Sequence, residues 1–134
     1  MSSIFTKIIN REVPAHIVWE NETHIAFLNI KPINPGHLLV VPKKETGYIF
    51  DMSDEDYKEV LMIAKWLAKP LQIATNAKRI GLSVEGFGVD HVHVHLIPIN
   101  EMNEMDPNRE KGASEEELAE MAEKIIKEIE SSAL

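Results

Sequence analysis

Residues 91–97, His-Val-His-Val-His-Leu-Ile, constrain the fold more than any other part of this sequence. The three histidines recur at every second position, which is the side-chain period of a β-strand and not of a helix. In an extended chain, all three imidazoles therefore point to one face and the apolar residues between them point to the other. Three adjacent imidazoles in a closed interior would need many hydrogen-bond partners. The pattern predicts a strand whose apolar face packs into a core and whose histidine face looks into a cleft or onto solvent.

Three kinds of chemistry could use such a row of imidazoles. Metal binding is the first, because neutral imidazole is a ligand for zinc, copper, iron and nickel. Neighbouring ligands on one strand face lie about 6 to 7 Å apart at the Cα level, so two can share an ion but a third in the same line strains the geometry. The sequence also offers no obvious carboxylate triad nearby. We therefore expect no metal and no other cofactor.

The second possibility is a histidine face that only forms hydrogen bonds across a subunit boundary, and three aligned imidazoles are a costly solution for that purpose. The third possibility is phosphorus chemistry. One neutral imidazole attacks the phosphorus while its neighbours donate hydrogen bonds to the phosphate oxygens and to the leaving group. This chemistry uses all three rings, and the sequence favours it.

Composition sets wider limits on the function. The 134 residues are enough for one domain, and 44% hydrophobic with 27% charged residues is typical of a globular protein. The absence of cysteine excludes disulfides and thiolate metal sites. A net charge of −8 argues against a broad nucleic-acid surface, but single nucleotides remain possible ligands. No signal-like segment and no apolar run of about 18 residues occurs, so we expect a cytoplasmic protein that does not associate with membranes.

Hydrophobic spacing and turn residues predict an α+β chain. Asp51 or Ser53 can cap a long helix that continues to about Ala77, and Pro70 should kink or split it near residues 66–69. Met62 and Trp66 are four residues apart in this helix and are expected in the core or at a subunit interface. Besides the histidine strand, we expect a short helix over residues 5–9 and strands over residues 17–20, 24–30, 37–41 and 80–85.

The C-terminal part has a different character. Residues 99–113 show no clear period and are expected to be irregular. Ser114 and Glu117 form a capping box, which predicts a helix to about residue 130. Gly86 and Gly88 flank Phe87 in a turn just before the histidines, where backbone N–H groups can face an anion.

The histidine motif together with its upstream context resembles the histidine triad (HIT) family, and in particular its Hint branch. The supporting segments occur in the same order and at similar spacing, and they are residues 4–9, 12–15, 26–32 and 35–44. The resemblance covers about residues 4–98. It implies a HIT-like α+β fold with an antiparallel sheet of about five strands, a long central helix and a C-terminal helix. One HIT domain would span residues 1–134, with its core in residues 1–98, and would pair as a homodimer with a ten-stranded sheet.

The resemblance also implies a reaction. His93 would attack the α-phosphorus of a nucleoside monophosphate derivative and form a covalent nucleotidyl-histidine, which water then hydrolyses. The carbonyl of His91 would fix the tautomer of His93, His95 would donate to the phosphate or the leaving group, and His37 would complete the hydrogen-bonded chain. Because the third triad position is a histidine and not a glutamine, hydrolysis is favoured over uridylyl transfer. The expected activity is a nucleotide hydrolase of the phosphoramidase or dinucleoside polyphosphate hydrolase class.

The resemblance assigns the nucleotide-binding residues as well. The ligand would be a purine nucleotide, an AMP or GMP derivative. Asn29 would meet the ribose hydroxyls, and the backbone amides of Gly86 and Gly88 would cradle the phosphate. The base pocket would be lined by Phe5, Ile8, Leu28 and Ile30.

Several positions depart from the Hint pattern. The family serine that touches the phosphate and the leaving group is missing from the segment around Gly88, and the ribose-binding aspartate is replaced by Asn29. Glu45 stands where a histidine is common. These departures keep open an alternative function, in which a HIT fold binds a nucleotide or a protein partner and its catalysis is vestigial.

Overall fold

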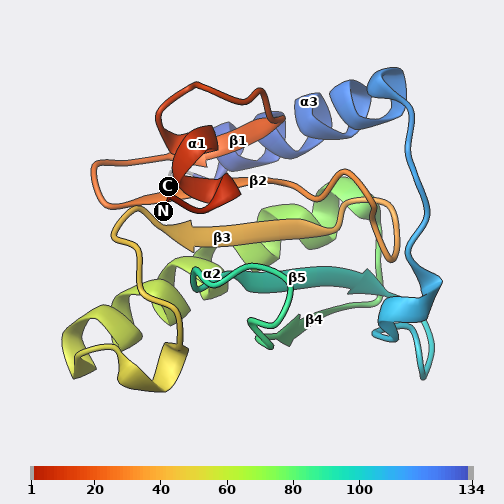
Figure 1. Cartoon of the computed structure of the whole chain (residues 1–134). Coiled ribbons are helices and arrows are strands. Elements are labelled where there is room, and N and C mark those ends of the chain that lie inside the picture. Colours follow the sequence, from red (N-terminus) through yellow and green to blue (C-terminus); the bar gives the residue numbers. More distant parts are fainter. Residues whose placement is uncertain (1, 133–134) are drawn as a thin grey trace.

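The fold is built on one antiparallel sheet of five strands in the order β1-β2-β3-β5-β4 (Figure 1). A computed structural model describes residues 2–132, so the expected domain over residues 1–134 extends at both ends beyond the described residues. The predicted α+β class with a five-stranded sheet is confirmed. The strands are β1 (Ile17–Glu20), β2 (His24–Leu28), β3 (Leu38–Pro42), β4 (Arg79–Ser83) and β5 (Val94–Ile99).

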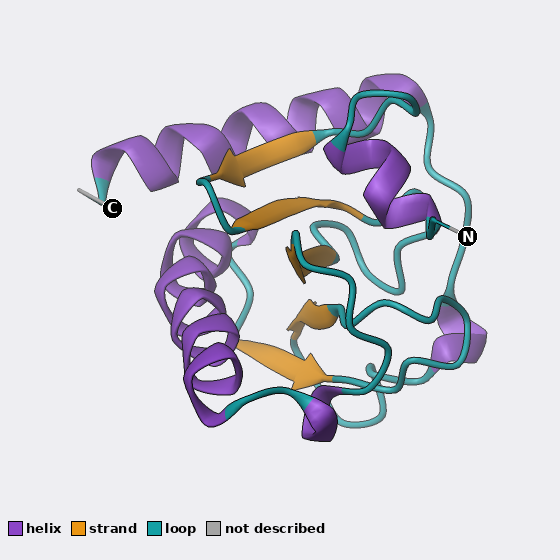
Figure 2. Ribbon diagram, turned by 60° about the vertical axis from the view of Figure 1, so that its left-hand side comes forward, coloured by secondary structure: helices purple, strands orange, loops and turns teal. Residues whose placement is uncertain are grey.

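Helices cover both faces of the sheet (Figure 2). The long helix α2 (Asp54–Thr75) and the C-terminal helix α3 (Glu115–Ser131) pack on one face, and the short helix α1 (Ile4–Ile9) packs on the other, which we call the α1 face. Two short 3-10 helices, η1 (Ile49–Asp51) and η2 (Pro107–Arg109), lie in connecting segments. No helix within residues 2–132 is both long and apolar enough to cross a bilayer.

The central strands are apolar on both faces because both faces are covered. In β2, Ala26 and Leu28 belong to the core under α2 and α3, whereas Ile25 and Phe27 belong to the cluster under α1. This alternation decides which side chains can reach the histidines, since the two faces are separated by the sheet.

Helix α2 is continuous over 22 residues, so the predicted split at Pro70 is wrong, and the alternative of a kink there stays a prediction. Ser53 caps its start by accepting a hydrogen bond from the Asp56 N–H at 3.1 Å. Pro70 is buried within it, and the loss of one backbone donor there is tolerated because buried apolar residues at helical spacing hold the helix on the sheet. The helix ends at Thr75, where Asn76 adopts a left-handed conformation with φ of 55°.

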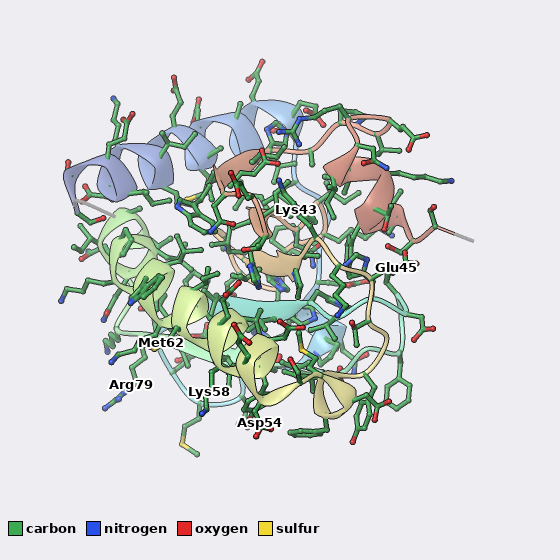
Figure 3. All side chains as sticks on the ribbon, turned by 90° about the vertical axis from the view of Figure 1, so that its left-hand side faces the viewer. Lys43, Glu45, Asp54, Lys58, Met62 and Arg79 are labelled. Atoms are coloured by element: carbon green, nitrogen blue, oxygen red, sulfur yellow. The ribbon has the colours of Figure 1, made fainter. Side chains whose placement is uncertain are left out.

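Of the two locations predicted for Met62 and Trp66, the core is wrong, and the subunit interface stays a prediction. Their exposed fractions are 43% and 48%, and Figure 3 shows Met62 on the outer side of α2. The two residues were predicted from apolar spacing, but the stripe that faces the sheet is one position away, at Ile63 and Leu67.

The histidine strand begins later than predicted. Strand β5 starts at Val94, which pairs with Val40 of β3, and His95 pairs with Ser83 of β4. Before this point the chain leaves the ladder, because the Val92 N–H donates to the Thr46 carbonyl at 2.7 Å instead of to a neighbouring strand.

The C-terminal segment follows the predicted pattern. Residues 100–114 contain only the short η2, and the Lys111 N–H donates to the Pro32 carbonyl at 3.1 Å. The capping box of Ser114 and Glu117 is present at the start of α3. This helix buries an apolar stripe against the sheet and α2, formed by Leu118, Ala122, Ile125 and Ile129.

Candidate active site

Three imidazoles come together where β3 and β5 lie side by side. His37 precedes β3, and its Nε2 lies 2.8 Å from Nδ1 of His95 on β5. The rings of His93 and His95 are edge to face, with centroids 4.9 Å apart. The structure therefore gathers His37, His93 and His95 into one contiguous group. In the sequence, His37 lies 56 positions before His93 and 58 before His95.

The hydrogen bonds fix the tautomers of two of these rings. The Ile33 N–H donates to Nδ1 of His37 at 3.0 Å, so this nitrogen is an acceptor. Neutral His37 must then carry its proton on Nε2 and donate it to Nδ1 of His95. Neutral His95 consequently carries its own proton on Nε2, which makes that atom a hydrogen-bond donor.

Burial keeps this pair neutral. Burial, assisted by the neighbouring imidazoles of His95 and His93, lowers the pKa of His37 to about 3. Burial and the neighbouring His93 lower the pKa of His95 to about 4. Near neutral pH, both rings therefore act as directed hydrogen-bonding groups and not as cations.

His93 has the opposite tautomer. Its Nδ1 lies 2.7 Å from the His91 carbonyl oxygen, which can only accept, so Nδ1 carries the proton. Burial lowers the pKa of His93, and the bond to the His91 carbonyl partly opposes this shift. Nε2 of neutral His93 therefore keeps a lone pair, which nucleophilic attack requires.

His91 does not face a cleft, which corrects the prediction that all three strand histidines share one open face. Its exposed fraction is 0%. Nε2 donates to the Pro42 carbonyl at 2.7 Å, and Nδ1 lies 2.7 Å from the hydroxyl oxygen of Ser3. The contact with Ser3 places His91 against the start of α1. His91 therefore supports His93 through its backbone carbonyl.

An apolar wall adjoins the histidines on the α1 face. The ring of Phe5 packs edge-on against His93, with centroids 4.9 Å apart, and lies 5.5 Å from the ring of Phe27. Ile8 is buried in the same cluster. Leu28, by contrast, is buried on the other face of the sheet, in the core under α2 and α3. Of the residues expected to line a base pocket, Phe5 therefore contacts His93 and Ile8 belongs to the same cluster. Leu28 lies on the opposite face of the sheet and borders a cavity that His37 also lines.

Asn29 and Ile30 follow β2 at the same end of the sheet as His37. The Asn29 N–H donates to the His37 carbonyl at 2.9 Å, and the Asn29 side-chain oxygen accepts from the Lys31 N–H at 2.9 Å. Ile30 has an exposed fraction of 61%. A cavity of about 420 Å³ borders Asn29 and His37, between the loop at residues 32–36 and α3.

The glycine turn before the histidines is partly open to solvent. Gly86 has φ of +85°, a conformation that side chains disfavour. A Cβ atom placed on Gly88 would meet nothing within 4 Å. Within residues 2–132, no group of three or more histidine, aspartate or glutamate side chains is arranged to hold a metal ion.

Sequence reasoning missed the residues that hold His91. Ser3, Thr6, the Pro42 carbonyl and Glu45 all contribute to its surroundings. In the sequence, Glu45 stands out only as a departure from a family pattern, and Ser3 gives no signal beyond that of an ordinary helix N-cap. Ser3 and His91 are 88 positions apart, and nothing in the sequence pairs them.

Comparisons with known proteins agree with this geometry. Residues 10–102 match the HIT domain family. An uncharacterised HIT-like protein of Methanocaldococcus jannaschii is 40% identical over 105 residues, which is 71% of this chain and 77% of that protein. The adenosine 5′-monophosphoramidase of Schizosaccharomyces pombe is 32% identical over 143 residues, with 96% of this chain and 99% of that protein covered.

A solved structure gives the same fold. The crystal structure of a HIT-like protein from Bartonella henselae superposes with a TM-score of 0.83 at 32% identity, covering 95% of this chain and 96% of that one. The family match spans more than half of the chain and includes all three strand histidines. This chain belongs to the HIT family.

Proposed function

We propose that this protein is a nucleotide hydrolase that cleaves a nucleoside monophosphate derivative at its α-phosphorus through a covalent bond to His93. The single observation that carries the proposal is the 2.7 Å contact between Nδ1 of His93 and the carbonyl oxygen of His91. The His91 carbonyl holds the proton on Nδ1, so Nε2 is free to attack, and the neighbouring His95 is set by His37 to donate from its own Nε2. A nucleophile beside a fixed donor is what transfer at phosphorus requires.

The reaction would proceed in two displacements. The Nε2 lone pair of His93 forms a bond to phosphorus while the bond to the leaving group breaks, and the leaving group takes up a proton. Water then forms a new bond to phosphorus, the bond to Nε2 breaks, and the water releases a proton. His95 donates a hydrogen bond to the phosphoryl group or the leaving group in both steps, which stabilises the charge that develops there.

The phosphoramidase class is the favoured activity. A relative that matches 96% of this chain is an adenosine 5′-monophosphoramidase, which supports an adenosine nucleotide as the substrate. In this proposal, Phe5, Ile8 and Ile30 contact a purine base and Asn29 contacts the ribose. The amides of Gly86 and Gly88 contact the phosphate.

The decisive experiment follows AMP release from adenosine 5′-phosphoramidate, with diadenosine polyphosphates as alternative substrates. Intact-mass spectrometry after rapid mixing should show the parent protein with one added AMP group, and His93→Ala should lack this adduct. The His93→Ala rate should fall by at least about a hundredfold. His16→Ala is the matched control, because His16 contacts Glu115 at the start of α3 and should keep the parent rate.

A binding module without turnover is the second candidate. The missing family serine and the replacement of aspartate by Asn29 favour it. Equal rates for the parent and His93→Ala, with nucleotide binding retained in both, would establish the binding module and exclude the hydrolase.

We further propose that the protein is a homodimer whose two sheets join through β4. This strand is one of the two edge strands of the sheet, the other being β1, and its Leu82 has an exposed fraction of 49%. An uncovered edge strand with an exposed apolar side chain is a natural pairing surface. Sedimentation equilibrium should give twice the chain mass of 15.2 kDa, and Leu82→Lys should shift the protein towards monomers.

A further inference from the structure

The carboxylate of Glu45 joins the loop after β3 to the first turn of α1. One of its oxygens, Oε1, accepts hydrogen bonds from the Ser3 N–H at 2.7 Å and from the Thr6 hydroxyl at 2.8 Å. The same oxygen lies 3.8 Å from Nδ1 of His91. These hydrogen bonds, led by the one from the Ser3 N–H, lower the pKa of Glu45. We call Ser3, Thr6 and Glu45 the N-terminal clasp, and Figure 3 shows Glu45 beside the start of α1.

The clasp holds the ring of His91 through the hydroxyl of Ser3. The Pro42 carbonyl can only accept, so Nε2 of His91 carries a proton, and in a ring with that single proton Nδ1 is an acceptor. The Ser3 hydroxyl, 2.7 Å away, therefore donates to Nδ1 while its oxygen accepts from the Thr6 N–H at 3.1 Å. The buried His91 ring is fixed at both of its nitrogens.

Fixing His91 also fixes the group that selects the tautomer of His93. The carbonyl of His91 accepts from Nδ1 of His93 at 2.7 Å. Phe5, between the clasp residues Ser3 and Thr6, packs against both rings, with centroids 5.8 Å from His91 and 4.9 Å from His93. The clasp can therefore position His93 in two ways, through the carbonyl of His91 and through the ring of Phe5.

We propose that Ser3, Thr6 and Glu45 are positioning residues, which act through His91 to hold His93 in the orientation and tautomer that leave Nε2 free. The kinetic consequence rests on the proposed hydrolase function, whereas the effect on the imidazoles does not. Hydrogen-bond partners that orient metal-bound histidines typically contribute tenfold to a hundredfold in activity, and we expect a similar range for an imidazole nucleophile.

Two variants test the clasp. Ser3→Ala removes the donor to His91, and Glu45→Gln keeps an oxygen acceptor for the first turn of α1 but removes the charge near His91. We expect kcat for adenosine 5′-phosphoramidate to fall roughly tenfold or more in Ser3→Ala, and less in Glu45→Gln, with KM changed by less than about threefold. Ser3→Thr keeps a hydroxyl and should restore most of the lost rate.

The second measurement needs no substrate. Imidazole nitrogen shifts from two-dimensional 1H–15N NMR distinguish a nitrogen that carries a proton from one that does not. The parent should show His91 protonated on Nε2 and His93 protonated on Nδ1. In Ser3→Ala, the His91 signals should change and His93 should populate both tautomers. Glu45→Gln should move the same signals in the same direction by a smaller amount.

Matched controls come from α3, which uses the same capping chemistry without a hydrogen bond from Ser114 or Glu117 to His91 or His93. Ser114 caps α3 by accepting from the Glu117 N–H, and Glu117 accepts from the Ser114 N–H in return. Ser114→Ala and Glu117→Gln should therefore lower thermal stability much as the clasp variants do, while kcat and the imidazole signals stay at parent values.

The outcomes separate the two proposals. If the parent turns over substrate and the clasp variants match the α3 controls in kcat and in the spectra, the clasp is excluded and the hydrolase stands. If the parent shows no turnover but the imidazole signals of His91 and His93 move in Ser3→Ala and not in Ser114→Ala, the hydrolase is excluded and the clasp stands. Should Ser3→Ala fail to fold, Glu45→Gln with its Glu117→Gln control decides by the same two measurements.

Discussion

Nε2 of His37 lies 2.8 Å from Nδ1 of His95, and the Ile33 N–H on the far side of the His37 ring decides in which direction this hydrogen bond runs. A backbone amide thus determines the protonation of an imidazole that it does not touch. His95 is left with a proton on the nitrogen that is free to meet a phosphoryl oxygen or a leaving group.

Removing the His37 ring should therefore impair His95 at a distance. We expect His37→Ala to lower kcat by roughly tenfold to a hundredfold with little change in KM, because His95 then loses its fixed tautomer. His37→Gln should lose less, since the side-chain amide offers both a donor and an acceptor. Steady-state kinetics on the three proteins measures the effect, and an unchanged kcat in His37→Ala would contradict the relay.

The same burial makes stability depend on pH. The pKa of His37 is lowered to about 3 and that of His95 to about 4 in the folded protein, from 6.5, mainly because burial disfavours the charged ring. Between these values and pH 6.5, the unfolded chain binds more protons than the folded one. The contribution of His37 and His95 to the free energy of unfolding is therefore complete above pH 6.5. It is lost progressively as the pH falls towards 4 and then 3.

Urea unfolding at a series of pH values checks this dependence. The midpoint should be nearly constant from pH 8 to pH 7 and should fall steadily below pH 6.5. The carboxylates of the chain titrate in the lower part of this range, so the informative quantity is the difference between two proteins. His37→Gln lacks the imidazole whose pKa is lowered to about 3 and should show a shallower decline, and an identical decline in both proteins would contradict the assignment.

The backbone conformation of Gly36 determines where the next residue, His37, lies in the folded protein. Its φ is +91°, and a Cβ atom at this residue would lie 2.6 Å from the Cγ2 atom of Thr75 in α2. Gly36→Ala should therefore destabilise the fold by about 1 to 3 kcal/mol, through both the strained backbone and the contact with α2. It should also lower activity by displacing His37.

Gly112→Ala is the matched control for this substitution. A Cβ atom at Gly112 meets nothing within 4 Å, and Gly112 does not have a positive φ. Chemical denaturation should therefore leave this variant close to the parent. Equal stability of the two alanine variants would show that Gly36 is not constrained.

The contrast between local and long-range features explains what the sequence could predict. Alternation of histidine with valine and leucine predicts an extended segment, and the capping box at Ser114 and Glu117 predicts the start of α3, because both signals lie within a few residues. The start of β5 at Val94 depends instead on where β3 and β4 offer pairing partners. No property of residues 91–97 alone contains that information.

The site divides in the same way. The family resemblance predicts that His37 lies beside the histidine strand, and in the structure its ring contacts that of His95. The contact between Ser3 and His91 could not be predicted, because a serine before a short apolar run indicates only a helix cap. Pro70 shows the opposite failure, since a strong local signal for a break is overruled by the burial of α2 against the sheet.

Leu28 and Phe5 provide the last test, because they were assigned to one pocket and the structure puts them on opposite faces of the sheet. Both are buried, so both alanine variants should destabilise the fold, by about 2 to 5 kcal/mol for Leu28→Ala and about 3 to 5 kcal/mol for Phe5→Ala. Only Phe5 contacts His93, so only Phe5→Ala should raise KM for adenosine 5′-phosphoramidate and lower kcat when both are measured well below their unfolding temperatures. If KM rises as much in Leu28→Ala as in Phe5→Ala, the nucleotide contacts the face of the sheet that α2 and α3 cover. In that case, the cavity of about 420 Å³ beside Asn29 and His37, which Leu28 also lines, would be the place to look for the base.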